Sequence, residues 1–211
     1  MATRSRIWLR GISTSYGTQP SFLALAMAER QKASGKDFIT SILVSYDVTS
    51  RIIDATRPSF KYRSKYYSCS PHAFGATIAA AKILKLNESA ICDAIGISAY
   101  TAPLANLNLW LKSKPASSQI NGDLYWHCET GIEAALLVER GFKGPQGALD
   151  KKEWGFWASI SDRCNWRILT SQLGEEFYLK KNLTEDSLCP PDDTKRTGSE
   201  VRQLGKARNQ R

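Results

Sequence analysis

Histidine is the side chain whose unperturbed pKa lies closest to neutral pH, and this chain has two, His72 and His127. His72 stands where the aromatic and polar stretch YYSCSP gives way to the small-residue run AFGATIAAAKILKL. An imidazole there could act as a general acid or base in the wall of an active site. It could also be a hydrogen-bonded histidine at the start of a tightly packed helix, and the pattern leaves both interpretations open.

Cysteine offers a second kind of reactive group, and Cys128 directly follows His127. Adjacent residues on a helix point about 100° apart, which disfavours a nucleophile and base formed by this pair. The five cysteines form no CxxC pair, and the histidines are not spaced with them as zinc ligands would be. We therefore expect reduced thiols, no metal and no cofactor.

The composition is that of a folded globular protein, because 42% of the 211 residues are hydrophobic and 23% are charged. The net charge of +9 raises the question of nucleic-acid binding. The basic residues, however, are dispersed among acids and lack aromatic interleaving. No run approaches the roughly 20 apolar residues that span a bilayer. Neither a nucleic acid nor a membrane is expected as a partner.

Apolar residues recur at spacings of three and four between Gly, Pro and Asn, which predicts a mainly helical, all-α body. We expect helices near residues 22–32, 36–54, 73–86, 88–101, 128–140 and 151–160. In the second of these helices, the expected buried face is formed by Ile39, Leu43, Tyr46 and Ile53.

Capping residues mark several of the expected helix ends. Asn87 and Asp150 are predicted N-caps, because their side chains can accept hydrogen bonds from the free amides of a first turn. Gly141 is predicted to end the helix that precedes it. The segment EEFYLKK, near residues 176–181, is expected to begin a short strand.

Four segments carry a resemblance to a known family when they are read in order. They are ASGKDFITSILVSYDVTSRI, SPHAFGATIAAAKILKLNESAICDAIGISAYTAPLANL, GIEAALLVERGFKGPQGALDKKEWGF and LGEEFYLKK. With them the chain resembles the 2-methylcitrate dehydratase family, called MmgE/PrpD, whose members include cis-aconitate decarboxylase. The strongest single piece is GIEAALLVERGFKGP.

The resemblance implies a large all-α domain, a smaller α/β lid domain and a substrate pocket between them. This chain resembles the helical domain over residues 20–181, as a partial copy, and the lid domain is expected to be missing. Residues 1–19 form a poorly matched N-terminal segment. Residues 182–211 are highly charged with little apolar periodicity, so we expect a disordered tail.

The function that the resemblance implies is that of a lyase. Members of the 2-methylcitrate dehydratase family eliminate water from citrate-type tricarboxylic acids. The preferred interpretation for this chain is a 2-methylcitrate or alkylcitrate dehydratase. A cis-aconitate decarboxylase-like enzyme is one alternative. Another is a catalytically inactive homologue that forms a homodimer or pairs with a full-length relative. The expected small-molecule partner is a tricarboxylate, and the expected compartment is intracellular, either cytoplasmic or mitochondrial.

The site residues that the resemblance implies do not match the family in every position. In a family pattern like HPTATFGAFGAAAA, the histidine falls on Tyr66, whereas His72 takes a position usual for a small residue. Tyr66 and His72 are the candidate catalytic residues. Lys114 fits a family lysine and is the candidate for binding a substrate carboxylate, while Asp123 and His127 both lie near the position of another family histidine.

Overall fold

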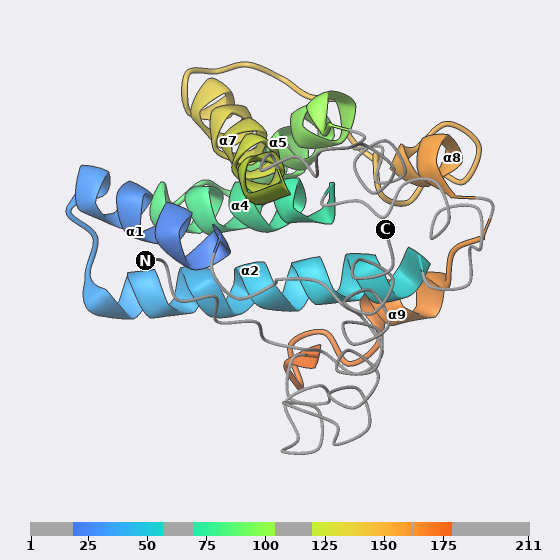
Figure 1. Ribbon diagram of the computed structural model, residues 1–211, viewed down its shortest axis with the longest axis horizontal. Helices are drawn as coiled ribbons and strands as arrows, with labels where there is room; N and C mark the ends of the chain where they lie inside the picture. Colours follow the sequence, from blue (N-terminus) through green and yellow to red (C-terminus); the bar gives the residue numbers. More distant parts are fainter. Residues whose placement is uncertain (1–18, 57–69, 104–119, 162, 179–211) are drawn as a thin grey trace, which may run out of the picture.

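The computed structural model describes residues 19–56, 70–103, 120–161 and 163–178, and within these ranges the chain is helical with no strand (Figure 1). The all-α prediction is therefore confirmed. The segment before Gln19 and the charged tail at 182–211 lie outside the described residues. The helices are α1 (Gln19–Gln31), α2 (Gly35–Thr56), α4 (Pro71–Ile83), α5 (Glu88–Thr101), α7 (Ile120–Glu139), α8 (Phe156–Ile160) and α9 (Trp166–Thr170).

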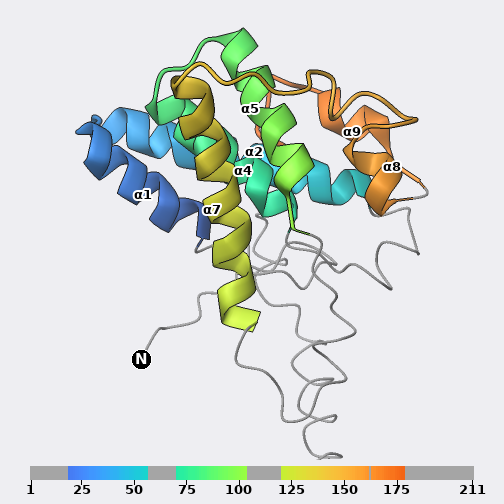
Figure 2. The ribbon, with the colours of Figure 1, turned by 90° about the horizontal axis from the view of Figure 1, so that it is seen from above.

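Helix α4 is the central element, and it packs against α1, α2, α5 and α7 (Figures 1 and 2). Every residue of α4 except Lys82 is buried, so this helix has no solvent-facing side. Its sequence suits that position, because Ala and Gly let neighbouring backbones approach from all directions. Whatever lies at the start of α4 is consequently held inside the bundle.

Two glycines set how closely α4 approaches its neighbours. A Cβ atom on Gly75 would overlap Thr49 Oγ1 and press on Ser45 Oγ of α2. A Cβ atom on Gly131 of α7 would overlap the carbonyl oxygen of Ala73. The overlap at Gly131 is with backbone and cannot be relieved by side-chain rotation, and the overlap at Gly75 would displace the Thr49 hydroxyl from its hydrogen bond, so both crossings favour glycine.

The predicted buried face of α2 is only half right. Tyr46 and Ile53 are buried, but Ile39 is 58% exposed and Leu43 is 39% exposed. The face of α2 that is turned inward is instead lined by the buried small polar residues Ser41, Ser45 and Thr49. The Thr49 hydroxyl donates a hydrogen bond of 2.8 Å to the Ser45 carbonyl of its own helix. It therefore needs no partner between α2 and α4, and the two helices can stay close.

Two hydrophobic clusters fill the space at opposite ends of α4. The cluster at its C-terminal end consists of Met27, Ala28, Ala80, Ile83 and Ala135. The cluster at its N-terminal end consists of Ile52, Ala55, Phe74, Phe156, Trp157 and Ile160, with the Phe74 and Phe156 rings edge to face at 4.7 Å. The short helix α8 therefore closes the core beside the start of α4.

Local signals placed two helix ends correctly. The side chain of Asn87 accepts a hydrogen bond of 2.9 Å from Ala90 N and caps α5 as predicted. Gly141 adopts a φ of +90° directly after α7, which is the left-handed conformation that glycine allows at a helix end.

Three other predictions about element ends are wrong. Helix α7 starts at Ile120 rather than 128, although Tyr125 and Trp126 are exposed and the first buried residues described in it are His127 and Cys128. Asp150 does not cap a helix, since its amide donates to Gly147 O in a turn, and α8 begins only after Gly155. Residues 176–178 form no strand, and 179–181 lie outside the described residues.

The turn after α7 is fixed to α5 by a buried carboxylate. Asp93, whose side chain is 3% exposed, accepts hydrogen bonds of 3.1 Å from Gln146 Nε2 and from Lys143 Nζ. The hydrogen bond from Gln146, together with Lys143 and the Gly144 amide, lowers the pKa of Asp93 below its ordinary value in spite of burial. The charged form is therefore the one that this turn stabilises.

Asp93→Asn should remove a pH-dependent part of the protein's stability. A lowered native pKa means that the carboxylate stabilises the fold above its unfolded pKa, and that this contribution is lost as the pH falls through the native pKa. Urea unfolding near pH 7 should show wild type more stable than Asp93→Asn, and near pH 3 the gap should be smaller. An equal gap at both pH values would contradict this assignment.

Lys85→Gly should stabilise the protein. Lys85 follows α4 with a φ of +54°, and Leu86 N donates to Ala81 O at 3.0 Å across the turn. Glycine relieves the strain of the left-handed backbone, and this gain exceeds the loss from the greater entropy of glycine in the unfolded chain. The net effect should raise the free energy of unfolding by about 0.5–1 kcal/mol. Lys82→Gly, in the regular last turn of α4, is the matched control and should lower it by a similar amount. Chemical denaturation of both variants measures the two signs, and Lys85→Gly must be the more stable one.

Candidate functional site

Both histidines of the chain lie inside the bundle near the start of α4. His72 is the second residue of α4 and is fully buried, and His127 on α7 is 1% exposed. The crossing of the two helices connects them, because Gly131 lies one turn after His127 and packs on the carbonyl of Ala73, the neighbour of His72. The structure thus gathers the two imidazoles around one helix start.

One backbone carbonyl joins three elements at this place. The Pro103 oxygen, just after α5, accepts a hydrogen bond of 2.5 Å from Ser70 Oγ and lies 3.0 Å from His127 Nε2. A carbonyl oxygen can only accept, so His127 must carry a proton on Nε2 and donate it. We call Ser70, Pro103 and His127 the Pro103 clamp, which joins the start of α4, the end of α5 and α7.

The clamp changes what each of its side chains can do. Ser70 occupies the N-cap position of α4, but its hydroxyl makes no capping hydrogen bond to that helix and reaches Pro103 instead. With Nε2 committed to a carbonyl, His127 orients the elements around it and offers no free Nε2 lone pair as a base. His127 is thus a positioning residue in this structure.

The other predicted site residues fall outside the described residues. Tyr66 lies in the segment 57–69 and Lys114 in the segment 104–119. Each segment adjoins a clamp residue in the chain, since Ser70 follows the first and Pro103 precedes the second. The clamp therefore brings together Ser70, which follows the segment with Tyr66, and Pro103, which precedes the segment with Lys114.

No sequence pattern predicts the Pro103 clamp directly. A serine before Pro-His-Ala indicates a helix start, but its partner is a backbone carbonyl 33 residues away. No residue type marks such an acceptor. The family resemblance placed His127 only near the position of a family histidine, and the hydrogen bond to Pro103 gives it a defined position.

Thiol and metal chemistry find no support in the described residues. Cys128 is fully buried beside His127, and burial raises the pKa of the Cys164 thiol to about 11, which keeps it protonated at neutral pH. Within the described ranges, no three His, Cys, Asp or Glu side chains are grouped to hold a metal ion.

None of the described helices is both long enough and apolar enough to cross a membrane.

A comparison with protein-family models identifies the MmgE/PrpD N-terminal domain over residues 20–169. That range is well over half of the chain and contains both histidines and all three residues of the Pro103 clamp. A search of curated proteins found no match.

His127→Leu should destabilise the protein more than His127→Gln. Leucine removes one of the two side-chain donors to the half-buried Pro103 carbonyl, which should cost about 0.5–1.5 kcal/mol, whereas the glutamine amide can still donate. The free energies of unfolding from urea titrations measure the difference. Trp126→Leu, on the preceding residue that is 66% exposed, is the control and should change little. Equal losses for leucine and glutamine would show that packing, and not the hydrogen bond, is what His127 contributes.

Proposed function

Because the chain belongs to the MmgE/PrpD family, we propose that it is a 2-methylcitrate or alkylcitrate dehydratase-like protein that eliminates water from citrate-type tricarboxylic acids. The observation that carries the proposal is the family match across the helical bundle. The positions of the two histidines support it, because both are buried near the start of α4. The segments that carry Tyr66 and Lys114 adjoin Ser70 and Pro103, which lie at the same place.

The proposed reaction requires three kinds of group. A base takes a proton from the carbon next to the hydroxyl-bearing carbon, an acid protonates the leaving hydroxyl so that it departs as water, and the electron pair becomes the new C=C bond. Cationic groups must also hold the carboxylates. We assign proton transfer to His72 and Tyr66, and carboxylate binding to Lys114.

These assignments differ in how well ordinary side-chain chemistry supports them. Imidazole can exchange a proton near neutral pH, but a phenol with an unperturbed pKa of about 10 is better suited to donate than to accept. An ammonium group suits Lys114 to a substrate that carries several negative charges. No cofactor is part of the proposal.

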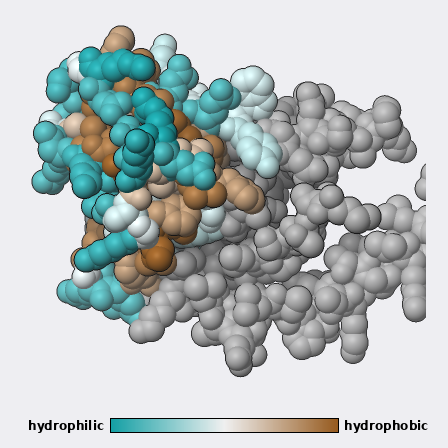
Figure 3. Space-filling model, turned by 90° about the vertical axis from the view of Figure 1, so that its left-hand side faces the viewer, coloured by the Kyte–Doolittle hydropathy of each residue, from teal (hydrophilic) through white to brown (hydrophobic). Residues whose placement is uncertain are grey.

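A catalytically inactive homologue that binds another protein is the rival, and two observations favour it. His72 is fully buried and His127 Nε2 is engaged by a backbone carbonyl, as structural histidines would be. Large apolar side chains are also exposed on α1 and α2, namely Phe22, Leu25, Ile39 and Leu43. Figure 3 shows hydrophobic surface among hydrophilic residues at the end of the bundle where α1 meets α2.

Incubating the full chain with 2-methylcitrate, citrate and cis-aconitate separates these functions. We expect an unsaturated tricarboxylate from 2-methylcitrate, measured by NMR of the reaction mixture. Release of CO2 from cis-aconitate would instead identify a decarboxylase. Failure to turn over any of the three, together with no binding by calorimetry, would overturn the proposal in favour of the inactive homologue.

Lys114→Ala should weaken binding of 2-methylcitrate about ten- to a hundredfold, because loss of an ammonium–carboxylate contact in a partly desolvated pocket costs about 1.5–3 kcal/mol. Lys112→Ala, two residues away, is the matched control and should bind almost as wild type does. His72→Ala should bind 2-methylcitrate nearly as wild type does, and it should lower both turnover and thermal stability, because the imidazole is assigned to proton transfer and is fully buried. Normal binding by Lys114→Ala, with binding abolished in a stably folded His72→Ala, would show that the histidine holds the substrate.

A further inference from the structure

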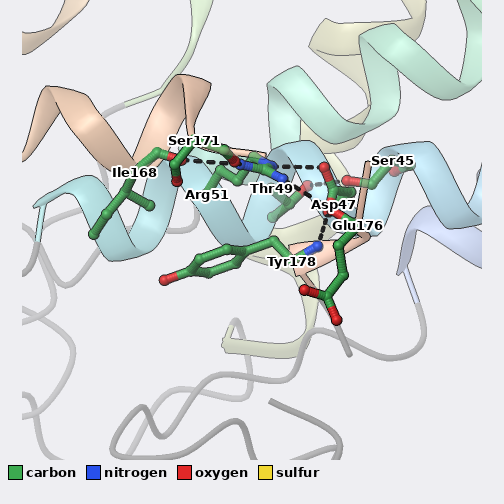
Figure 4. A network of polar contacts seen from close by, with 8 residues as sticks. All are labelled: Ser45, Asp47, Thr49, Arg51, Ile168, Ser171, Glu176 and Tyr178. Carbon is green, nitrogen blue, oxygen red and sulfur yellow. Dashed lines mark hydrogen bonds and ion pairs between the residues drawn. The ribbon is translucent and has the colours of Figure 1, made fainter. Parts of the chain in front are cut away.

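A strap formed by residues 165–178 lies on α2 at the end of the described chain (Figure 4). Its beginning is anchored to the body by backbone and ring contacts. Asn165 N donates to the carbonyl of Ala55 on α2 at 2.8 Å, and the Trp166 ring lies 5.8 Å from the Trp157 ring. Trp166 and Leu169 also pack on the cluster beside α8. The first part of the strap, residues 165–169, is thus anchored against the hydrophobic core through Trp166 and Leu169.

The side chain of Arg51, on α2, contacts the strap at three positions and is buried, since Arg51 is 3% exposed. Its Nε donates to Asp47 Oδ2 at 2.7 Å, which orients the guanidinium. One terminal nitrogen donates to the carbonyls of Ile168 at 3.0 Å and Ser171 at 2.8 Å, at the C-terminal end of α9. The other donates to the carbonyl of Glu176 at 3.4 Å. One side chain therefore holds both halves of the strap.

Tyr178 contacts both α2 and the Arg51 guanidinium. Its backbone N–H donates to Asp47 Oδ1, and its hydroxyl donates to Asp54 Oδ2 at 2.6 Å. The Arg51 guanidinium lies over the Tyr178 ring at 5.2 Å from its centre. Asp47 and Asp54 are both buried, so Tyr178 contacts α2 through charges that are shielded from water.

The second half of the strap, residues 171–178, is held differently from the first. Its large apolar side chains face outward, since Leu173 is 55% exposed and Phe177 is 48% exposed. Gln172 and Gly174 have φ values of +55° and +81°, so the backbone bends sharply where the two halves meet. Hydrogen bonds to Arg51, Asp47 and Asp54, together with the Tyr178 ring under Arg51, join this half to α2.

We propose that residues 171–178 are a latch arm that Arg51 closes on α2, and that the arm opens while the bundle stays folded. Closing requires the planar fork of a guanidinium, because three carbonyls at different positions must be reached at once. The large apolar side chains Leu173 and Phe177 are already exposed, so we expect the arm to open without unfolding α4 or α7.

The latch has a consequence for the chain that follows. With the arm closed, Tyr178 lies against Asp47 and Asp54, so the chain continues from a fixed point on α2. With the arm open, that point is released. This inference rests only on described contacts and does not depend on the proposed dehydratase activity.

Hydrogen exchange of the full chain, followed by mass spectrometry, tests the latch. In the wild type, peptides from 171–178 should be protected, but less than peptides from α4. In Arg51→Lys, which keeps the positive charge and loses the fork, exchange in 171–178 should be at least about tenfold faster. Peptides from α4 and α7 should be unchanged. Arg167→Lys, at an exposed arginine on α9, is the control and should leave 171–178 protected.

Two results would overturn the proposal. One is an arm that exchanges equally fast in wild type and Arg51→Lys, and the other is an arm that exchanges only together with α4. Should Arg51→Lys fail to fold, Tyr178→Phe decides, because it removes the hydroxyl that donates to Asp54 and keeps the ring. A selective rise of exchange in 171–178 would then support the latch, and unchanged or uniformly faster exchange would reject it.

Discussion

The close approach of α4 to α2 on one side and to α7 on the other is the constraint on which the rest of the described structure depends. Gly75 and Gly131 make these approaches possible, since a Cβ atom at either position would overlap a neighbouring helix. Attraction between packed atoms falls steeply once a gap opens, so α4 cannot shift without losing both contacts. His72 is fixed inside the bundle because it lies on the first turn of this helix.

Small residues bring backbones together but bury little apolar area per residue, so polar contacts fix the segments at the edges of the bundle. At the start of α4, the Pro103 carbonyl receives the Ser70 hydroxyl and lies within hydrogen-bonding distance of the His127 ring. Along α2, Arg51 holds the strap through carbonyl oxygens. In both places, buried side-chain donors meet backbone acceptors from segments distant in sequence, which orients those segments more strictly than apolar contact would.

Features that depend on neighbouring residues could be predicted from the sequence, and features that depend on distant contacts could not. Asn87 and Gly141 act within one turn of their own helix, so residue type and spacing were sufficient. The early start of α7 was missed because the residues before His127 have poor helix propensity. The apolar spacing predicted the all-α fold class, and the family resemblance pointed to the start of α4. It could not supply the partners of Ser70 and Arg51, which are backbone carbonyls that carry no sequence signature.

The central claim is that the start of α4 lies beside a tricarboxylate site. Because the chain has only two histidines, NMR of protein with 15N-labelled histidine gives signals from two imidazole rings, each with two nitrogens, and His127→Gln assigns the rings. Titration with 2-methylcitrate should shift the His72 signal in a saturable way, and the His127 signal should keep the pattern of a protonated, hydrogen-bonded Nε2. If both signals stay unchanged at saturating 2-methylcitrate, the start of α4 is only a packed helix end and the account of the site is wrong.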